Sequence, residues 1–222
     1  MRIISKLFLA GLALAATPAK ACDSTLDIVL DLSGATGFDN NGNDFDILRE
    51  LVVLTGLQEA LGKPKDGGLR RVTVFAPRDD AFIRLADQLS DLVDGDFNSD
   101  DEEEAFTYIA GVLTTIAGDL GTDLKMLVTS ILQYHIGNKP IVFMDEARKG
   151  KKKHMVTTLY DKMMIEVEMA MPTDNNNMRM KMIHEADGQS FRYPKIHNTL
   201  YDIETCNGRL NVLKDVLIPL DV

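Results

Sequence analysis

The sequence lacks the short motifs that mark the common enzyme classes. It contains no Gly-x-Ser-x-Gly elbow, no phosphate-binding loop, no His-Glu-x-x-His helix and no dinucleotide fingerprint. Its few histidines follow no metal-ligand spacing: His135, His154, His184 and His197. The sequence therefore predicts no enzyme, no catalytic residue and no cofactor. An undetected hydrolase, with residues brought together from distant segments, is a rival interpretation.

Long apolar runs and basic charge are scarce too. The apolar run from Leu7 to Ala16 is too short for a hydrocarbon core that needs about 20 residues, and no later stretch is long enough. Lys and Arg number 24 against 34 Asp and Glu, which gives a formal net charge of -10. We therefore expect no transmembrane segment and no nucleic-acid partner, since binding nucleic acid relies on a basic surface.

The first 21 residues have the three parts of a secretory signal peptide. Arg2 and Lys6 precede the apolar run, and Ala19-Lys20-Ala21 follows it. Cleavage after Ala21 would leave residues 22–222, with a net charge of -13 because three basic residues and no acid are removed. We expect a secreted or periplasmic protein. A lipoprotein anchored at Cys22 is the alternative, although Lys20 stands where a small uncharged residue is expected.

The sequence contains two cysteines, and their positions favour a disulfide bond between them. Cys22 begins the mature chain, and Cys206 lies near its end in a compartment that permits disulfides. A Cys22–Cys206 bridge would tie the N-terminus to the last strands and stabilise the fold by up to about 5 kcal/mol. Two free or lipid-modified thiols are the alternative.

Hydrophobic periodicity places helices mainly in the first half of the chain and strands mainly in the second. Helices are predicted at Leu26 to Leu32, from an N-cap at Asp44 to Gly62, from an N-cap at Asp79 or Asp80 to Leu92, at Phe106 to Ala117 and at Leu124 to Tyr134. Strands are predicted at Arg71 to Phe75, Ile165 to Met171, Met178 to Ile183 and Arg209 to Leu213, the last opened by a tight Asn207-Gly208 hairpin turn. This order indicates an α+β fold.

Separated segments of the chain resemble the signature segments of the fasciclin (FAS1) domain. They are Thr73 to Phe82, which begins Thr-Val-Phe-Ala-Pro, Ile131 to Ile136, Thr158-Leu159, and Ile203 to Pro219. The resemblance implies one domain over residues 22–222, built as a wedge of two β-sheets flanked by several helices. It also implies a cell-adhesion or extracellular-matrix module that binds a protein or polysaccharide surface without covalent chemistry. Longer loops and Asn211, in place of a frequent histidine, depart from the family pattern.

Tyr134 and His135 carry a contact role if the resemblance extends to function, because this pair takes part in adhesion in some family members. The alternative is that both side chains end an apolar segment and are partly buried, with hydrogen-bonded polar tips.

Two acidic loops offer oxygen ligands at alternate positions, as calcium loops do. The first contains Asp39, Asn41, Asn43 and Asp44, and the second contains Asp94, Asp96, Asn98 and Asp100. Neither fits the EF-hand template, and the same residues fill ordinary turns. The alternative function is therefore an exported metal-binding protein, with calcium at these loops or copper at the methionine-rich strands.

Methionine and lysine are concentrated in two neighbouring stretches. The methionines are Met155, Met163, Met164, Met169, Met171, Met178, Met180 and Met182, which could bind copper near His154 or His184 or simply fill the core. The basic run is Arg148, Lys149, Lys151, Lys152 and Lys153. It could dock on an anionic polysaccharide or lipid head group, or it could be a solvated hairpin loop.

Overall fold

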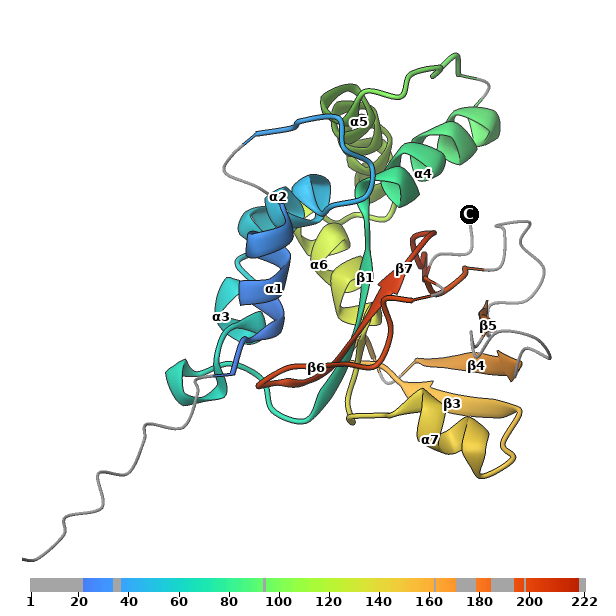
Figure 1. Ribbon diagram of the computed structural model, residues 1–222. Coiled ribbons are helices and arrows are strands. Elements are labelled where there is room, and N and C mark those ends of the chain that lie inside the picture. The colour runs from blue at the N-terminus through green and yellow to red at the C-terminus, as the bar shows by residue number, and fades with distance from the viewer. Residues whose placement is uncertain are drawn as a thin grey trace, which may run out of the picture.

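The computed structural model in Figure 1 describes residues 22–33, 37–93, 95–161, 163–170, 179–184, 194–197 and 199–219. The predicted signal peptide lies outside these residues. None of the helices within them is long and apolar enough to span a bilayer.

The helices of the first half pack together on one side of the molecule (Figure 1). They are α1 (Thr25–Leu32), α2 (Asp46–Thr55), α3 (Gln58–Leu61), the 3-10 turn η1 (Pro64–Asp66), α4 (Asp79–Leu92), α5 (Glu102–Asp119) and α6 (Leu124–Tyr134). The single helix predicted up to Gly62 is wrong: Gly56 adopts a left-handed φ of 79° and ends α2 before α3 begins. Asp101 caps α5 by accepting a hydrogen bond from the Glu104 N–H, so this helix starts earlier than predicted.

Two sheets complete the fold, which confirms the predicted α+β class. One has the strand order β2-β1-β7-β6, formed by β1 (Val72–Pro77), β2 (Ile136–Gly137), β6 (Ile203–Glu204) and β7 (Gly208–Leu213). The other has the order β3-β4-β5, formed by β3 (Lys153–Thr157), β4 (Met164–Ala170) and β5 (Arg179–His184). The helix α7 (Phe143–Arg148) lies beside the second sheet in Figure 1, and the sequence pattern missed both α7 and β3.

Strands β1 and β7 are parallel neighbours, and all residues of β1 and the last four of β7 are buried. Alternate residues of a strand point to opposite faces, and β1 accordingly contacts two cores. Val72, Val74 and Ala76 pack with the helices of the first half. Phe75 packs in a second core with Phe143 of α7, at a ring-centroid distance of 6.0 Å. The pairing of β1 with β7 thus joins the first half of the chain to its last strands.

Asn207 and Gly208 form a turn, though not the two-residue turn predicted. The hairpin joins β6 to β7 through a turn in which the N–H of Thr205 donates to Gly208 O, and only Gly208 of the dipeptide has a positive φ, 151°. A side chain at Gly208 would lie 2.0 Å from the carbonyl oxygen of Val72. Close approach of the two strands, rather than turn geometry, therefore requires this glycine.

Candidate functional site

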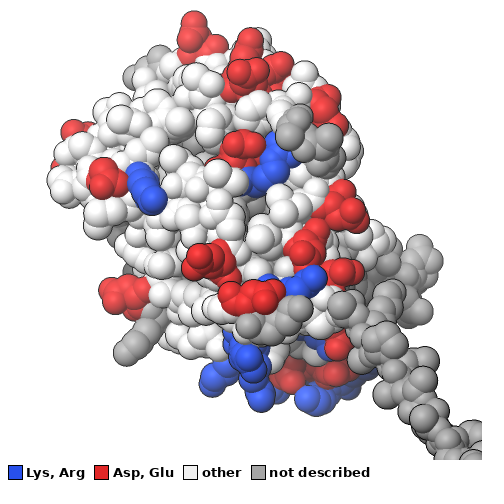
Figure 2. Space-filling view, turned by 90° about the vertical axis from the view of Figure 1, so that its left-hand side faces the viewer, with Lys and Arg blue, Asp and Glu red and all other residues white. Residues whose placement is uncertain are grey.

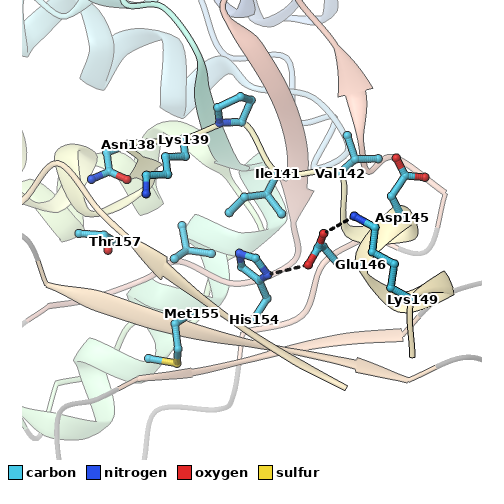
Figure 3. A pocket seen from close by; sticks show the side chains of 12 residues that line it. Asn138, Lys139, Ile141, Val142, Asp145, Glu146, Lys149, His154, Met155 and Thr157 are labelled. Carbon is cyan, nitrogen blue, oxygen red and sulfur yellow. Dashed lines mark hydrogen bonds and ion pairs between the residues drawn. The ribbon is translucent and has the colours of Figure 1, made fainter. Parts of the chain in front are cut away.

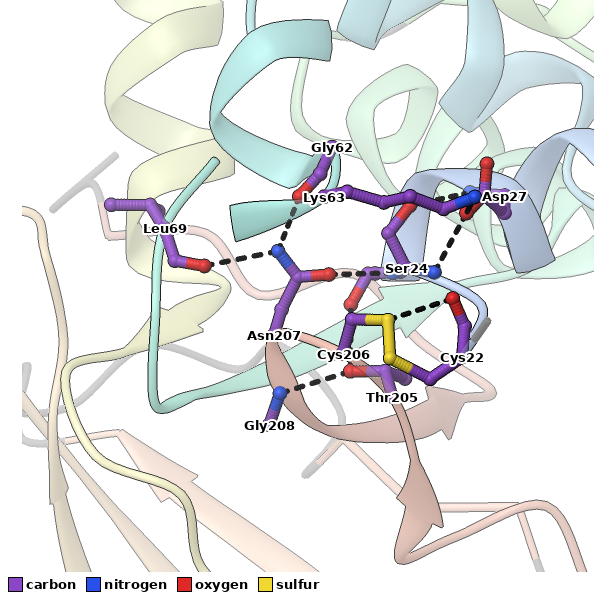
Figure 4. The surroundings of a disulfide bond; sticks show 11 residues. Cys22, Ser24, Asp27, Gly62, Lys63, Leu69, Thr205, Cys206, Asn207 and Gly208 are labelled. Atoms are coloured by element: carbon purple, nitrogen blue, oxygen red, sulfur yellow. Dashed lines mark hydrogen bonds and ion pairs between the residues drawn. A yellow bond between two sulfur atoms is a disulfide. The ribbon is translucent and has the colours of Figure 1, made fainter. Parts of the chain in front are cut away.

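The N-terminal segment is tied to the β6–β7 turn by the predicted disulfide. Cys22 and Cys206 are bonded, with Cα atoms 5.5 Å apart (Figure 4). Asn207 lies beside the bridge: its Oδ1 accepts from the Thr25 N–H at 2.9 Å, and its Nδ2 donates to the carbonyls of Gly62 and Leu69. The bridge thus sits in a rigid corner of the fold.

Tyr134 and His135 lie in the interior, at the end of α6. They are 1% and 3% exposed. The His135 Nδ1 is 2.8 Å from Ile131 O, and its Nε2 accepts a hydrogen bond from the Leu217 N–H at 3.0 Å. Both side chains are more deeply buried than the partly buried placement predicted as the alternative to a contact role. Direct contact of either side chain with a partner stays a prediction, and it would require this end of α6 to be uncovered.

The first acidic loop leads to a cluster of carboxyl groups that the sequence did not reveal. Asp44 groups with Asp79 and Glu102, and Asp39 groups with Asp46 and the same Glu102, with the carboxylate oxygens of each group within 4.8 Å of one another. We call the buried residues Asp44, Asp46, Asp79 and Glu102 the acidic centre. Asp39 lies exposed at its edge.

Three helix N-termini converge on the acidic centre. Residues 37–45 pass below α5 and turn back beside the start of α4 before α2 begins (Figure 1). Glu102, the first residue of α5, accepts hydrogen bonds from the N–H groups of Asp39 and Asn40 through its Oε2. Asp79, the first residue of α4, accepts from the N–H groups of Asp46 and Ile47 at 2.8 Å each.

These contacts correct two predicted caps. Neither Asp79 nor Asp80 caps α4, because the N-cap is Arg78 and it makes no side-chain cap. Asp44 does not cap α2, whose N-cap is Phe45, and Asp79 supplies the missing acceptor from a different helix. Sequence rules pair a cap with the helix that follows it, so they cannot find a cap donated across the fold.

The four carboxyl groups of the acidic centre are almost completely buried, with at most 5% of any residue exposed. Within the described residues, the one ion pair they make joins Asp46 Oδ1 to Arg49 Nη1 at 2.6 Å. Three buried oxygens have no hydrogen-bond partner: Asp44 Oδ1, Asp46 Oδ2 and Glu102 Oε1. Burial raises the pKa values of Asp46 and Glu102. Burial, reinforced by a hydrogen bond with Asp44, raises the pKa of Asp79 to about 9.

The predicted calcium residues of the first loop do not all reach this centre. Asp44 belongs to it, Asp39 lies at its edge, and Asn41 holds Asp44 in place by donating to its Oδ2 at 3.0 Å. Asn43 instead accepts a hydrogen bond from Arg78 Nη1 at 2.6 Å. In the second acidic loop, Asp94 lies outside the described residues, so the predicted alternation there is not tested.

A second candidate site is the hollow between α7, β3 and the segment that joins β2 to α7, which we call the α7–β3 hollow. Its volume is about 440 Å³. In Figure 3, Asn138 and Lys139 lie on one side of it, and Glu146 of α7 and Lys149, the C-cap of that helix, lie on the other. Glu146 is hydrogen-bonded to Lys151 and Lys149, which lower its pKa to about 2, and lies 3.4 Å from His154 Nδ1.

The predicted basic run borders this hollow. It begins at the end of α7 and continues through Gly150 into β3, with the side chains exposed. Ion pairs with Asp145, Glu146 and Glu166 neutralise part of its charge. Figure 2 shows one face of the molecule, where Lys and Arg are most concentrated at the lower end, with Asp and Glu among them and over the rest of the face.

The methionine stretch falls only partly within the described structure. Met169 is buried and lies opposite Met180 in the register of β4 and β5, whereas Met155 is exposed. Met171 and Met178 lie outside the described residues, so copper binding by this stretch stays a prediction.

Comparison with known proteins identifies the fold family. The family described as Fasciclin domain matches residues 43–219. The chain belongs to this family. Among solved structures, the fasciclin domain described here is similar to a FAS1 domain pair from the insect cell adhesion molecule Fasciclin I, with a TM-score of 0.51 and 14% identity. The match covers 89% of this chain and 51% of that one, so the chain spans about half the length of the pair. No curated protein matches it significantly in sequence.

The signature segments of this fasciclin domain form its centre. Thr73 to Phe82 comprises β1 and the start of α4, and Ile131 to Ile136 comprises the end of α6 and the start of β2. The last segment holds β6 and β7. Because β1 pairs with both β2 and β7, these three segments, which are far apart in the sequence, are neighbours in one sheet.

Proposed function

We propose that this fasciclin domain is an exported adhesion module that binds an anionic polysaccharide at the α7–β3 hollow. Family membership and the fold of an insect adhesion molecule support a binding role. The observation that carries the proposal is a hollow of about 440 Å³ lined by Lys139 and Lys149, next to the exposed basic run, on a chain of net charge -10. Pockets of roughly 300–1,000 Å³ are typical of ligand sites.

The chemistry of the hollow suits a charged sugar chain. Asn138 and Thr157 offer hydrogen-bonding groups, and the half-buried Val142 offers apolar surface for the face of a sugar ring. Lys139 and Lys149 lie on opposite sides of the hollow and can pair with carboxylate or sulfate groups, Lys149 in exchange for its ion pair with Glu146. Binding would be non-covalent and reversible, with no bond made or broken.

Calorimetric titration with heparin or alginate, and with neutral dextran as a control, tests the proposal. We expect binding to the anionic polymers only, weakened by added salt because exposed charges are screened. The double variant Lys139→Ala/Lys149→Ala should bind about twofold to fivefold more weakly, since an exposed charge pair contributes up to about 1 kcal/mol. Lys125→Ala, which removes an exposed lysine of α6, is the matched control. Equal binding of dextran, or an unchanged affinity of the double variant, would refute the proposal.

Export belongs to the same proposal and is tested separately. The Cys22–Cys206 disulfide supports it, because disulfides persist in oxidising compartments. N-terminal sequencing of the protein recovered outside the cytoplasm should begin at Cys22. A chain that begins at Met1 would contradict export by a cleaved signal.

A further inference from the structure

We propose that the acidic centre binds one Ca²⁺ ion, held by carboxylate oxygens of Asp44, Asp46 and Glu102 between the starts of α2, α4 and α5. Asp79 lies close to Asp44 and Glu102, and the exposed Asp39 lies close to Asp46 and Glu102, so each can add a ligand on its side of Glu102. This site differs from a linear calcium loop, because its ligands come from one loop and three helix starts that are far apart in the sequence.

The main support is the way each of three side chains is held. One oxygen of each is fixed by the protein: Asn41 donates to Asp44 Oδ2, Arg49 to Asp46 Oδ1, and the Asn40 N–H to Glu102 Oε2. The second oxygen of each is buried and has no hydrogen-bond partner. Buried polar atoms nearly always have a hydrogen-bond partner. Three buried oxygens without one in the same cluster therefore indicate a bound cation that accepts their electron pairs.

The spacing of the oxygens suits calcium. Ca²⁺ takes six to eight oxygens at about 2.3–2.6 Å, so oxygens on opposite sides of one ion lie about 4.8 Å apart. Within each of the two groups, one carboxylate oxygen from every residue lies within 4.8 Å of the others, and Glu102 belongs to both groups. Mg²⁺ binds oxygen at about 2.0–2.1 Å and usually keeps several bound water molecules. A buried set of carboxylates leaves little room for these waters, so the site favours Ca²⁺ over Mg²⁺. The donors are all oxygen, which disfavours copper and zinc.

The balance of charges in the acidic centre also favours a bound cation. Four buried carboxylates face one ion-paired cation, Arg49. When all four groups are ionised, the N-termini of the three helices add roughly half a positive charge each, which still leaves more than one negative charge uncompensated. A proton shared between Asp44 and Asp79 would remove one charge, yet Asp46 Oδ2 and Glu102 Oε1 would stay without a partner. A divalent cation satisfies both the charge and the oxygens.

The experiment titrates the chelator-treated full-length protein with CaCl₂ in a calorimeter and follows its melting temperature. We expect one ion per chain and a melting temperature raised by about 5–11 °C when free calcium is 100 times Kd. Added chelator should reverse the shift. Absence of both a binding heat and a thermal shift at about 10 mM calcium, above the range of extracellular sites, would overturn the proposal.

Glu102→Gln and Glu103→Gln form a matched pair of variants. Both remove one charge from the first turn of α5, but Glu103 is exposed and outside the acidic centre. Glu102→Gln should weaken calcium binding at least tenfold while leaving the metal-free protein at least as stable, and Glu103→Gln should bind as the wild type does. Equal calcium responses in the two variants would show binding by general surface charge and would refute the site.

Asp39→Asn provides a second test that does not disturb the core. Asp39 is exposed, and asparagine can still accept the hydrogen bond from the Asn41 N–H. If Glu102→Gln fails to fold, a several-fold weaker calcium affinity of Asp39→Asn supports the site, and an unchanged affinity counts against it.

Discussion

Ile47 and Asp79 are joined by a hydrogen bond of 2.8 Å in which the Ile47 N–H donates to the Asp79 carboxylate. The same carboxylate accepts from the Asp46 N–H. The first turn of α2 is therefore capped by the first residue of α4, and the two helices cannot separate without leaving buried N–H groups unpartnered.

This relationship predicts that Asp79→Ala is less stable than Asp79→Asn by about 1–2 kcal/mol. Both substitutions remove the buried acid, but only alanine leaves α2 without an acceptor for its N–H groups. Urea unfolding in the presence of chelator measures the difference without a contribution from calcium. At the exposed Asp87 of the same helix, the alanine variant should be the more stable of the pair, because alanine favours the helix. Equal stabilities of the two Asp79 variants would show that the cap contributes nothing.

Gly208→Ala should destabilise the fold by more than about 3 kcal/mol. The residue has a φ of 151°, and its new Cβ would collide with the Val72 backbone where β1 and β7 pair. Gly111 lies in the middle of α5, where an added side chain would meet no other atom within 4 Å. Gly111→Ala should therefore stabilise the protein by about 0.5–1 kcal/mol. Thermal unfolding of both variants checks the prediction, which fails if Gly208→Ala melts near the wild type.

His135→Ala should lower the free energy of unfolding by about 2–4 kcal/mol. The substitution leaves a cavity and removes the acceptor for the Leu217 N–H. Polysaccharide affinity, corrected for the folded fraction, should stay at the wild-type value. A variant of normal stability that has lost binding would instead show that His135 contacts the partner.

Glu146 should make the protein sensitive to acid. Hydrogen bonds from Lys151 and Lys149 lower its pKa to about 2, from 4.5. A lowered folded pKa gives stability that is complete above pH 4.5 and is lost as the pH falls through about 2. Wild type should therefore be more stable than Glu146→Gln at neutral pH, and the gap should close between pH 4.5 and 2. Urea unfolding across this range measures it, and a gap independent of pH would contradict the shift.

Local sequence signals predicted much of the fold. The apolar periodicity of Leu124 to Tyr134 matches α6, and the β-branched run before Pro77 matches β1. These signals depend on neighbours within a turn or a strand, which the sequence records directly. Helix α7 is only six residues long, too short to show a clear period.

The candidate sites were less accessible to sequence reasoning. Asp39 and Asp44 were identified by their loop pattern, but Asp46 and Glu102 lie within helical segments where an acid is ordinary, and Asp79 has the pattern of a local cap. No rule of sequence spacing links residues at the starts of three different helices. The α7–β3 hollow likewise depends on the approach of residues 138–142 to β3.

The order of residues by itself determined where most of the longer helices and strands form, which segments resemble the fasciclin family, and which two cysteines could bond. Only the tertiary structure decided that Asp79 caps α2, that Asn207 holds the N-terminal segment, and that four acids share one buried site. The reason is physical: local hydrogen bonds and periodicity are properties of adjacent residues, whereas burial and shared charge arise only when distant segments enclose the same space.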